Sequence, residues 1–315
     1  MTARLSFILC LLLLYACSPP PQPLRVAAIP WPGYEALFLA RAQGHLDPFA
    51  VHLVEMESAT SVLHELRNGT VDAAALTLDE TLSAIAQGVP LAVVLVLDIS
   101  DGADALLARP GIERLDELRG RKVGVETSAL GALMLQSALE AGGLKPSDVV
   151  VVPLTVDSHE RAFERGEIDA VVTFEPVRSR LLRAGARLLF DSRQIPGRII
   201  DVLAVRTDRV ADHATALEHL LRAWFRALAF QRNHPERAAR LMQPRLRLEV
   251  EAILAAFDGI EQPDAAANRS LLSGSPAPLD ERARELARFM AAHGLLPTDF
   301  SPPPLAIDRF LPAPP

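Results

Sequence analysis

The chain has 315 residues, a net formal charge of −7 and only two cysteines, Cys10 and Cys17. A mildly acidic chain argues against nucleic acid or an anionic membrane surface as a partner. Both cysteines fall in or beside a predicted leader peptide, which excludes an internal disulfide, a cysteine zinc site and a cysteine nucleophile from the folded part. A chain of this length favours two domains.

The N-terminus predicts export. Arg4 precedes the apolar run 5–15, which is too short to span a bilayer, since a spanning helix takes about 20 residues. The segment LYAC at 14–17 is typical of a bacterial lipobox, which predicts a lipoprotein signal peptide over 1–16. The alternative is an ordinary signal peptide cleaved near Ala16.

In the lipobox interpretation, Cys17 is acylated and anchors the chain to a bacterial membrane, in the periplasm or cell envelope. The proline-rich residues 17–23 then act as a stiff tether between the anchor and the folded part.

Strands and helices alternate from residue 24 onward. Strands are predicted at 24–29, 51–56, 73–76 and 91–98, and helices at 34–43, 60–67 and 79–87, with Asp79 as an N-cap. The run LAVVLVLD at 91–98 is apolar almost throughout, which indicates a strand buried on both faces of a parallel sheet.

The alternation then begins again. Further strands are predicted at 122–126, 149–154, 170–174, 186–190 and 199–206, with helices at 131–141, 159–165 and 177–184. From residue 208 the pattern is helical, with helices at 214–233, 235–242, 249–257 and 278–292. The proline-rich tail 301–315 is predicted to lie on the surface.

Two α/β series joined near residues 98–104 predict two doubly wound α/β lobes joined by two crossings, with a helical C-terminal part. The first lobe is predicted to contain 24–99 and 206–300, and the second 100–205. Ligands of such sheets bind at the carboxyl ends of the strands, and hinge closure of two lobes buries a small molecule. One large α/β enzyme domain is the alternative.

Several motifs in order resemble the nitrate/sulfonate/taurine-type substrate-binding proteins of ABC importers, including relatives that bind thiamine pyrimidine precursors. The motifs are WPGYE at 31–35, LRNGTVDAA at 66–74, GRKVGV at 120–125, FERGEIDAVV at 163–172 and FEP at 174–176. The resemblance implies a type II periplasmic-binding fold, a monomer that captures a small-molecule solute without a cofactor, and partner permease and ATPase subunits.

Two departures from the family pattern concern its anion chemistry. Phe174 stands where a tryptophan is commoner, and the turn 128–131 holds few hydroxyl groups. Both point away from a sulfonate or nitrate ligand.

The candidate ligand-binding residues follow the predicted strands or begin the helices after them. They are Trp31, Tyr34, Glu35, Thr77, Asp79, Asp98, Ser100, Asp104, Ser128, Leu130, Gly131, Glu175 and Asp201. Trp31 and Tyr34 form an aromatic pair that can stack on a planar ligand or contact a cation. The start of the helix after Ser128 is a natural acceptor site for an anion.

Each of these candidates has a structural alternative. Trp31 can be a packed core residue, Asp79 a helix cap, and the aspartates near Gly102 turn residues. Ser128 can be a simple helix start.

The charge of these loops is acidic, with few Lys or Arg residues, so the predicted pocket presents hydrogen-bond acceptors rather than the donors that an anion needs. We therefore expect a neutral or cationic nitrogen-containing solute. The alternatives are a sulfonate- or nitrate-type anion binder and a ligand-sensing lipoprotein that feeds a membrane receptor.

An enzyme is the rival from another class. A pyrimidine synthase of this fold would need an iron-binding cysteine-rich motif, and the chain has none. Its eight histidines are scattered without metal-ligand spacing, and we expect each at the surface. The sequence thus predicts neither catalysis nor a metal site.

Overall fold

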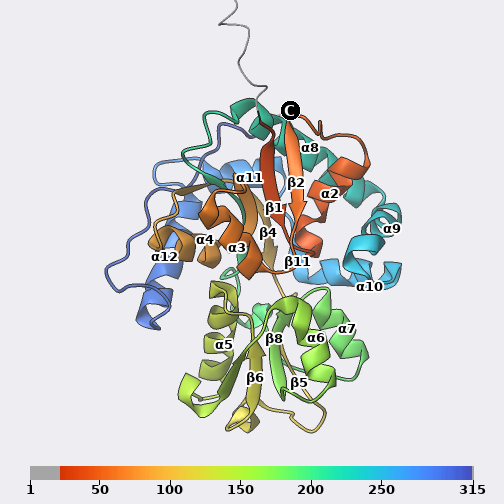
Figure 1. Ribbon diagram of the computed structural model, residues 1–315, viewed down its shortest axis with the longest axis vertical. Helices are drawn as coiled ribbons and strands as arrows, with labels where there is room; N and C mark the ends of the chain where they lie inside the picture. Colours follow the sequence, from red (N-terminus) through yellow and green to blue (C-terminus); the bar gives the residue numbers. More distant parts are fainter. Residues whose placement is uncertain (1–21, 314–315) are drawn as a thin grey trace, which may run out of the picture.

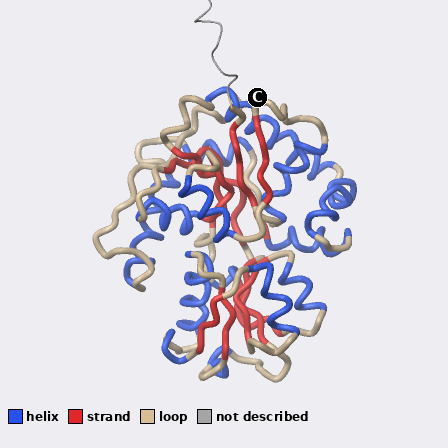
Figure 2. The backbone as a smooth tube through the Cα atoms, in the orientation of Figure 1, coloured by secondary structure: helices blue, strands red, loops and turns tan. Residues whose placement is uncertain are grey.

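The computed structural model describes residues 22–313, which form a large lobe and a small lobe, each built around one β-sheet (Figure 1, Figure 2). The predicted signal peptide, Cys17 and nearly all of the tether lie outside the described residues. Within the described part, none of the helices has the length and apolarity needed to span a membrane.

The large lobe holds a six-stranded sheet in the order β11-β4-β10-β3-β1-β2. Its strands are β1 (Leu24–Ala28), β2 (Val51–Glu55), β3 (Ala73–Thr77), β4 (Leu91–Ser100), β10 (Ile200–Arg206) and β11 (Ile260–Glu261). β1 pairs in parallel with β2 and β3, whereas β10 is antiparallel to both β3 and β4.

The small lobe holds a five-stranded sheet in the order β7-β6-β8-β5-β9. Its strands are β5 (Asp104–Ala108), β6 (Lys122–Val125), β7 (Val150–Pro153), β8 (Ala170–Phe174) and β9 (Arg187–Asp191). β6 is parallel to β7 and β8, and β5 is antiparallel to β8 and β9. The predicted two-lobed α/β fold is confirmed in this arrangement.

Helices cover both sheets (Figure 1). The large lobe contains α2 (Glu35–Ala42), α3 (Ala59–Asn68), α4 (Leu78–Ala86), α8 (Ala214–Asn233), α9 (Pro235–Leu246), α10 (Val250–Ala256), α11 (Ala265–Leu272) and α12 (Pro278–Ala292). The small lobe contains α5 (Ala129–Ala141), α6 (Val156–Glu164) and α7 (Val177–Arg183). The sequence pattern missed α11.

The N-cap of α4 differs from the prediction. Thr77, not Asp79, caps this helix: its hydroxyl accepts from the backbone N–H of Glu80, and the Glu80 carboxylate accepts from the backbone N–H of Thr77. This reciprocal pair is a capping box, which satisfies two of the free N–H groups at the helix start. Asp79 is thereby left without a capping role.

The predicted lobe boundary at residue 205 is wrong. Residues 200–206 form β10, which lies between β3 and β4 in the large sheet, so the chain returns to the large lobe before Ile200. β10 also gives β4 an antiparallel neighbour, which the prediction of a parallel setting missed. The apolar run of β4 indicates that the strand is buried. Whether its neighbours are parallel or antiparallel depends on which distant segments pair with it.

The two crossings between the lobes are joined by hydroxyl groups. Ser100 ends β4 and its Oγ lies 2.8 Å from Oγ of Ser192, which follows β9. The same Ser192 Oγ accepts from the backbone N–H of Gly102 at 2.6 Å. The first crossing is therefore tied to the second at the point where a hinge would bend.

The sequence predicted that the C-terminal tail lies on the surface, but the tail is partly buried and pairs with β4. The backbone of Val93 in β4 donates to the carbonyl of Leu305 at 2.8 Å and accepts from Ile307 at 2.9 Å. Leu305 and Phe310 are buried. The tail thus adds a short parallel bridge to β4. Burial of these apolar side chains outweighs the tendency of the surrounding prolines to disrupt strand pairing.

Two histidines also depart from the surface position expected for them. His159 in α6 is buried, with its imidazole 3.2 Å from Thr173 Oγ1, and burial lowers its pKa to about 4. His213, next to α8, is buried as well. Its Nε2 lies 4.0 Å from Asp72 Oδ2.

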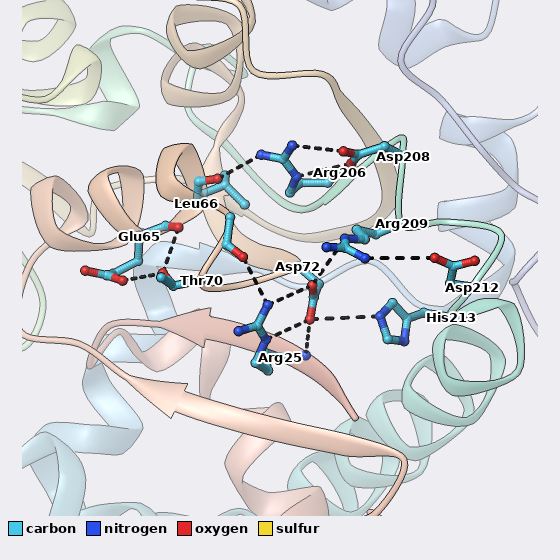
Figure 3. A network of polar contacts seen from close by, with 11 residues as sticks. Arg25, Glu65, Leu66, Thr70, Asp72, Arg206, Asp208, Arg209, Asp212 and His213 are labelled. Atoms are coloured by element: carbon cyan, nitrogen blue, oxygen red, sulfur yellow. Dashed lines mark hydrogen bonds and ion pairs between the residues drawn. The ribbon is translucent and has the colours of Figure 1, made fainter. Parts of the chain in front are cut away.

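Asp72, in the turn before β3, is the centre of a polar network far from the small lobe (Figure 3). Its carboxylate accepts from the backbone N–H and the guanidinium of Arg25 in β1, at 2.9 and 3.1 Å. Arg209 approaches the same carboxylate to 3.9 Å. Hydrogen bonds from Arg25 hold the pKa of Asp72 below its usual value although burial opposes this shift. The network fixes β1, β3 and the start of α8 together.

Candidate functional site

A small cavity lies between the lobes, at the carboxyl ends of β1 and β3 and the amino end of the antiparallel strand β10. Its volume is about 20 Å³. Of the predicted ligand-binding residues, six line it, namely Trp31, Tyr34, Thr77, Asp104, Leu130 and Asp201. Four further lining residues were not among the candidates, namely Ile29, Ala59, Glu80 and Phe174.

Aromatic rings form one wall of the cavity. Trp31 and Tyr34 belong to the short turn after β1, and their ring centroids are 6.4 Å apart. Phe174, at the end of β8 in the small lobe, packs its ring edge-to-face on Trp31 with centroids 5.8 Å apart. Trp31 is only 3 % exposed, so it is both a packed residue and part of the cavity wall. The rings close the gap between the lobes.

Each of the two large-lobe aromatic residues in this wall donates a hydrogen bond from its polar group to a carboxylate. Trp31 Nε1 donates to Asp98 Oδ2 at 3.1 Å, and the Tyr34 hydroxyl donates to Asp201 Oδ1. Asp98 and Asp201 are direct partners in the pairing of β4 with β10. Gly33 permits this arrangement, because a Cβ there would lie 1.9 Å from Asp98 Oδ2 and 2.4 Å from Trp31 Nε1.

Five buried carboxyl groups gather around this point, in a set that we call the carboxyl cluster: Asp79, Glu80, Asp98, Asp104 and Asp201. Among the described residues none of the five forms an ion pair with Lys, Arg or His. A buried carboxylate without a cation is costly, so such groups hold their protons to higher pH.

Burial raises the pKa of Asp79, Asp98 and Asp104 to about 7. The pKa of Glu80 rises to about 8, first through burial and then through the charges of Asp79 and Glu126. The pKa of Asp201 is also raised, by burial and by the neighbouring Asp98 and Asp104. The cluster therefore carries fewer charges near neutral pH than its five carboxyl groups suggest.

Glu80 is the principal residue that sequence reasoning missed. It lies three residues after Thr77, in the first turn of the helix that follows β3. A Thr-x-x-Glu pattern directly after a predicted strand would have indicated both the capping box and a carboxylate at the carboxyl end of the sheet. The sequence holds this motif at 77–80, and it begins two residues before the predicted cap, Asp79.

Glu35 and Glu175 do not belong to the carboxyl cluster. Glu35 accepts from Arg245 Nε of α9 at 2.9 Å, and Arg245 also bonds to Glu55. Burial raises the pKa of Glu35 to about 7 although Arg245 opposes the shift. Glu175 accepts from Arg178 at 3.0 Å and from the backbone and hydroxyl of Ser179, at the start of α7. Both predicted candidates are thus occupied by contacts within the protein.

Ser100, Ser128 and Gly131 have structural contacts. Ser100 joins the two crossings and accepts from the backbone N–H of Asp104 at 3.3 Å. Ser128 caps α5 by accepting from the N–H of Gly131 at 3.3 Å. A Cβ at Gly131 would lie 2.2 Å from the Glu126 carbonyl, so this glycine is required by the close approach of that backbone.

The lobes contact each other around the cavity. Thr60 of α3 donates from its backbone N–H and its hydroxyl to Glu126 Oε1 of the small lobe, at 2.9 and 2.8 Å. His293, after α12, lies 2.5 Å from Glu140 of α5. Arg180 of α7 donates to the Leu246 carbonyl at 3.3 Å. These contacts describe a closed arrangement of the two lobes.

A larger opening of about 700 Å³ lies between α12 and the loop at Arg198, but no member of the carboxyl cluster lines it. Within residues 22–313, no group of three or more His, Cys, Asp or Glu side chains has a geometry that could hold a metal ion.

Residues 18–243 match the NMT1-like family. The chain belongs to this family. A taurine-binding periplasmic protein of Escherichia coli K12 is 28 % identical over 162 residues, which cover 50 % of either chain. An aliphatic sulfonates-binding protein of the same organism, described as putative, is 26 % identical over 65 % of each chain. The chain thus matches about half to two thirds of the length of these relatives.

Solved structures share the fold over nearly the whole chain. The alkanesulfonate-binding protein of Xanthomonas axonopodis pv. citri, bound to MOPS, has a TM-score of 0.76 at 18 % identity and covers 89 % of this chain and 96 % of its own. The periplasmic nitrate-binding protein of Synechocystis PCC 6803 has a TM-score of 0.70 at 14 % identity, over 90 % of this chain and 84 % of its own. These relatives and neighbours are binding proteins rather than enzymes, and the predicted family resemblance is confirmed.

Proposed function

We propose that this protein is an extracytoplasmic solute-binding lipoprotein of an ABC importer, and that it captures a small neutral or cationic nitrogen-containing solute by hinge closure. The observation that carries the proposal is the carboxyl cluster, which is buried between the lobes without a basic partner among the described residues. The solute would then be delivered to a permease driven by an ATPase subunit.

The cost of buried charge favours a cation over an anion. A cation in the cavity would let carboxyl groups such as Asp98 and Asp201 ionise, and each ionised pair would be stabilised strongly at low local polarity. An anion would instead meet Glu80, Asp104 and Asp201, which line the cavity with oxygen atoms. The Trp31 and Tyr34 donors of the lining already bond to Asp98 and Asp201, and the lining holds no guanidinium or ammonium group for an anion.

The arginines near the lobe interface are already engaged. Arg245 lies between Glu35 and Glu55, and Arg178 is paired with Glu175. Moving either one toward an anion would leave a buried glutamate without its partner, which is strongly unfavourable. This supports a cargo different from those for which the curated relatives are named.

The mechanism we propose uses the two crossings as a hinge, at residues 100–104 and between Asp191 and Ile200. Solute binds to the large lobe, where Trp31, Tyr34 and Asp201 are already arranged, and Leu130 and Phe174 of the small lobe then cover it. The solute shifts the balance toward closure only through the contacts that it gains in the closed state. Acylation of Cys17 and the tether 17–23 would hold the receptor at the membrane.

A second candidate is a sulfonate or taurine binder, which the names of the curated relatives favour. Isothermal titration calorimetry of the purified mature protein tests the two against each other, with amines, guanidinium and pyrimidines on one side and taurine, methanesulfonate and nitrate on the other. We expect binding only from the nitrogenous cations or neutral compounds. Binding of the anions alone would overturn the proposal.

A variant pair assigns the binding to the cavity. Asp201→Asn removes one carboxylate that lines the cavity, and we expect it to weaken binding of a cation at least tenfold. Asp208→Asn is the matched control, since Asp208 is exposed and pairs with Arg206 far from the cavity. Equal affinities in the two variants would contradict a site at Asp201.

A further inference from the structure

Four carboxylate oxygens of the large lobe have no hydrogen-bond partner within the described protein. They are Asp79 Oδ1, Asp79 Oδ2, Glu80 Oε1 and Asp98 Oδ1. The three residues are at most 2 % exposed. Buried acceptors are nearly always paired, so a group of orphan oxygens at one place needs an explanation.

The orphan oxygens belong to two elements that meet at the cavity. Asp79 and Glu80 stand in the first turn of α4, after β3, and Asp98 stands near the end of β4. Glu80 lines the cavity, as do Trp31, which holds the other oxygen of Asp98, and Asp201, the strand partner of Asp98. The charge of Asp79 acts on Glu80 and on Asp104, another lining residue. Glu80 thus places a free acceptor on the cavity wall itself, whereas Asp98 lies behind Trp31 and Asp79 is next to Glu80 in α4.

Two classes of cation suit a cavity with aromatic and acidic walls. A fully methylated ammonium ion binds to the faces of aromatic rings and has no N–H group. An ion with several N–H groups can donate to oxygen atoms in several directions. A methylated ion would leave all four oxygens desolvated and unpaired, which is the costly state for a buried acceptor.

The aromatic side chains favour the second class. Trp31 and Tyr34 use their polar groups to hold Asp98 and Asp201, and the Trp31 ring is covered by Phe174. The rings therefore fix the positions of the carboxylates and do not form a free aromatic cage.

We infer, building on the proposed function, that the site takes a small cation with several N–H donors, of the guanidinium, amidinium or primary ammonium class, and rejects fully methylated ammonium ions. The selecting groups are Asp79, Glu80 and Asp98, whose free oxygens accept from the N–H groups of the bound ion. Trp31 and Tyr34 are positioning residues, since Trp31 donates to Asp98 Oδ2 and Tyr34 donates to Asp201 Oδ1.

Calorimetry with the mature protein tests this inference with four chlorides at millimolar concentration: guanidinium, acetamidinium, methylammonium and tetramethylammonium. Sodium chloride at matched ionic strength serves as the blank. We expect at least one N–H-bearing ion to bind at least tenfold more tightly than tetramethylammonium. Repeating the titration in buffers of different ionisation enthalpy measures proton release, which we expect to be positive at neutral pH because bound cation replaces protons on the cluster.

A variant and its control locate the effect. Asp79→Asn keeps the size of the side chain but replaces an acceptor oxygen by an amide that needs an acceptor itself, and we expect at least a tenfold loss of affinity for the best N–H ion. Asp101→Asn removes a charge from the exposed side of the nearby crossing and should change affinity less than twofold. Circular dichroism verifies that both variants fold. If Asp79→Asn does not fold, the titration of the unmodified protein with the four chlorides decides the question.

The outcomes separate this inference from the proposed function. Equal or tighter binding of tetramethylammonium would overturn the donor requirement while leaving a cation receptor in place. Binding of a neutral pyrimidine and of none of the N–H ions would also overturn the inference, with the broader function retained. Binding of taurine or nitrate alone would overturn both.

Discussion

The indole N–H of Trp31 donates to Asp98 Oδ2 at 3.1 Å, and this bond passes over Gly33, where any side chain would collide with both partners. The contact joins the turn after β1 to the end of β4, although β3 and β10 lie between these two strands in the large sheet. It holds an aromatic wall and a buried carboxyl group in a fixed relation at the cavity.

Trp31→Phe should therefore destabilise the protein more than a similar change elsewhere. It keeps an aromatic ring but leaves Asp98 Oδ2 without a donor, which costs about 1–2 kcal/mol beyond the loss of volume. Trp224→Phe is the matched control, because Trp224 is fully buried and its Nε1 has no partner within the described protein. Urea unfolding of both variants measures the difference, and equal free energies of unfolding would refute the assigned bond.

The stability of the solute-free protein should fall as the pH rises from about 6.5 to about 8. Asp79, Asp98 and Asp104 have pKa values of about 7 in the fold, and Glu80 about 8. These values lie above the ordinary values near 4, so the folded state binds more protons than the unfolded state and is favoured at lower pH. The stabilisation is fully present below about pH 4 and is lost as the pH rises through about 7.

Thermal unfolding at the two pH values measures this effect. His159 does not interfere in this window, because its lowered pKa of about 4 reduces stability only as the pH falls below about 6.5. Asp98→Asn should flatten the dependence. A melting temperature that rises toward pH 8 would show that the cluster is not buried in the manner described.

Thr60→Val tests the contact that joins the lobes beside the cavity. The hydroxyl of Thr60 donates to Glu126 Oε1 at 2.8 Å, and its loss should weaken the closed form and hence solute binding about threefold to tenfold, since such a bond contributes about 0.5–1.5 kcal/mol. Thr70→Val is the control, because its hydroxyl bonds to the Glu65 carbonyl within the large lobe. Calorimetry gives the affinities, and small-angle scattering should show a more open average shape for Thr60→Val alone.

Asp72→Asn tests whether the network in Figure 3 is a structural element of the large lobe. Replacing the carboxylate weakens its bonds to Arg25, which is partly exposed, so we expect a loss of about 1–2 kcal/mol in the free energy of unfolding. Asp208→Asn, at an exposed pair, should lose less than about 0.5 kcal/mol. Solute affinity should be the same in both variants, and a selective loss of binding in Asp72→Asn would contradict a purely structural role.

Local sequence patterns were enough to predict the kinds of elements and many residues of the candidate site. Helices 214–233 and 278–292 were predicted with the bounds they have as α8 and α12, because a 3.6-residue hydrophobic period, and for α12 a proline at its first position, are local signals. The acidic and aromatic character of the cavity was also predicted, since Trp31 and Tyr34 follow the first strand and Asp201 lies in the strand that returns to the large lobe.

Which carboxyl groups have partners became clear only from the folded arrangement of the chain. Glu35 and Glu175 looked equivalent to Asp98 in the sequence, yet Arg245 and Arg178 engage the first two. Arg245 is 210 residues from Glu35 along the chain, so no local pattern could predict the pair. The same holds for β10, whose place between β3 and β4 brings Asp201 beside Asp98. Burial, and pairings such as that of Glu35 with Arg245, depend on contacts distant in sequence, and they decide which acids remain free to meet a ligand.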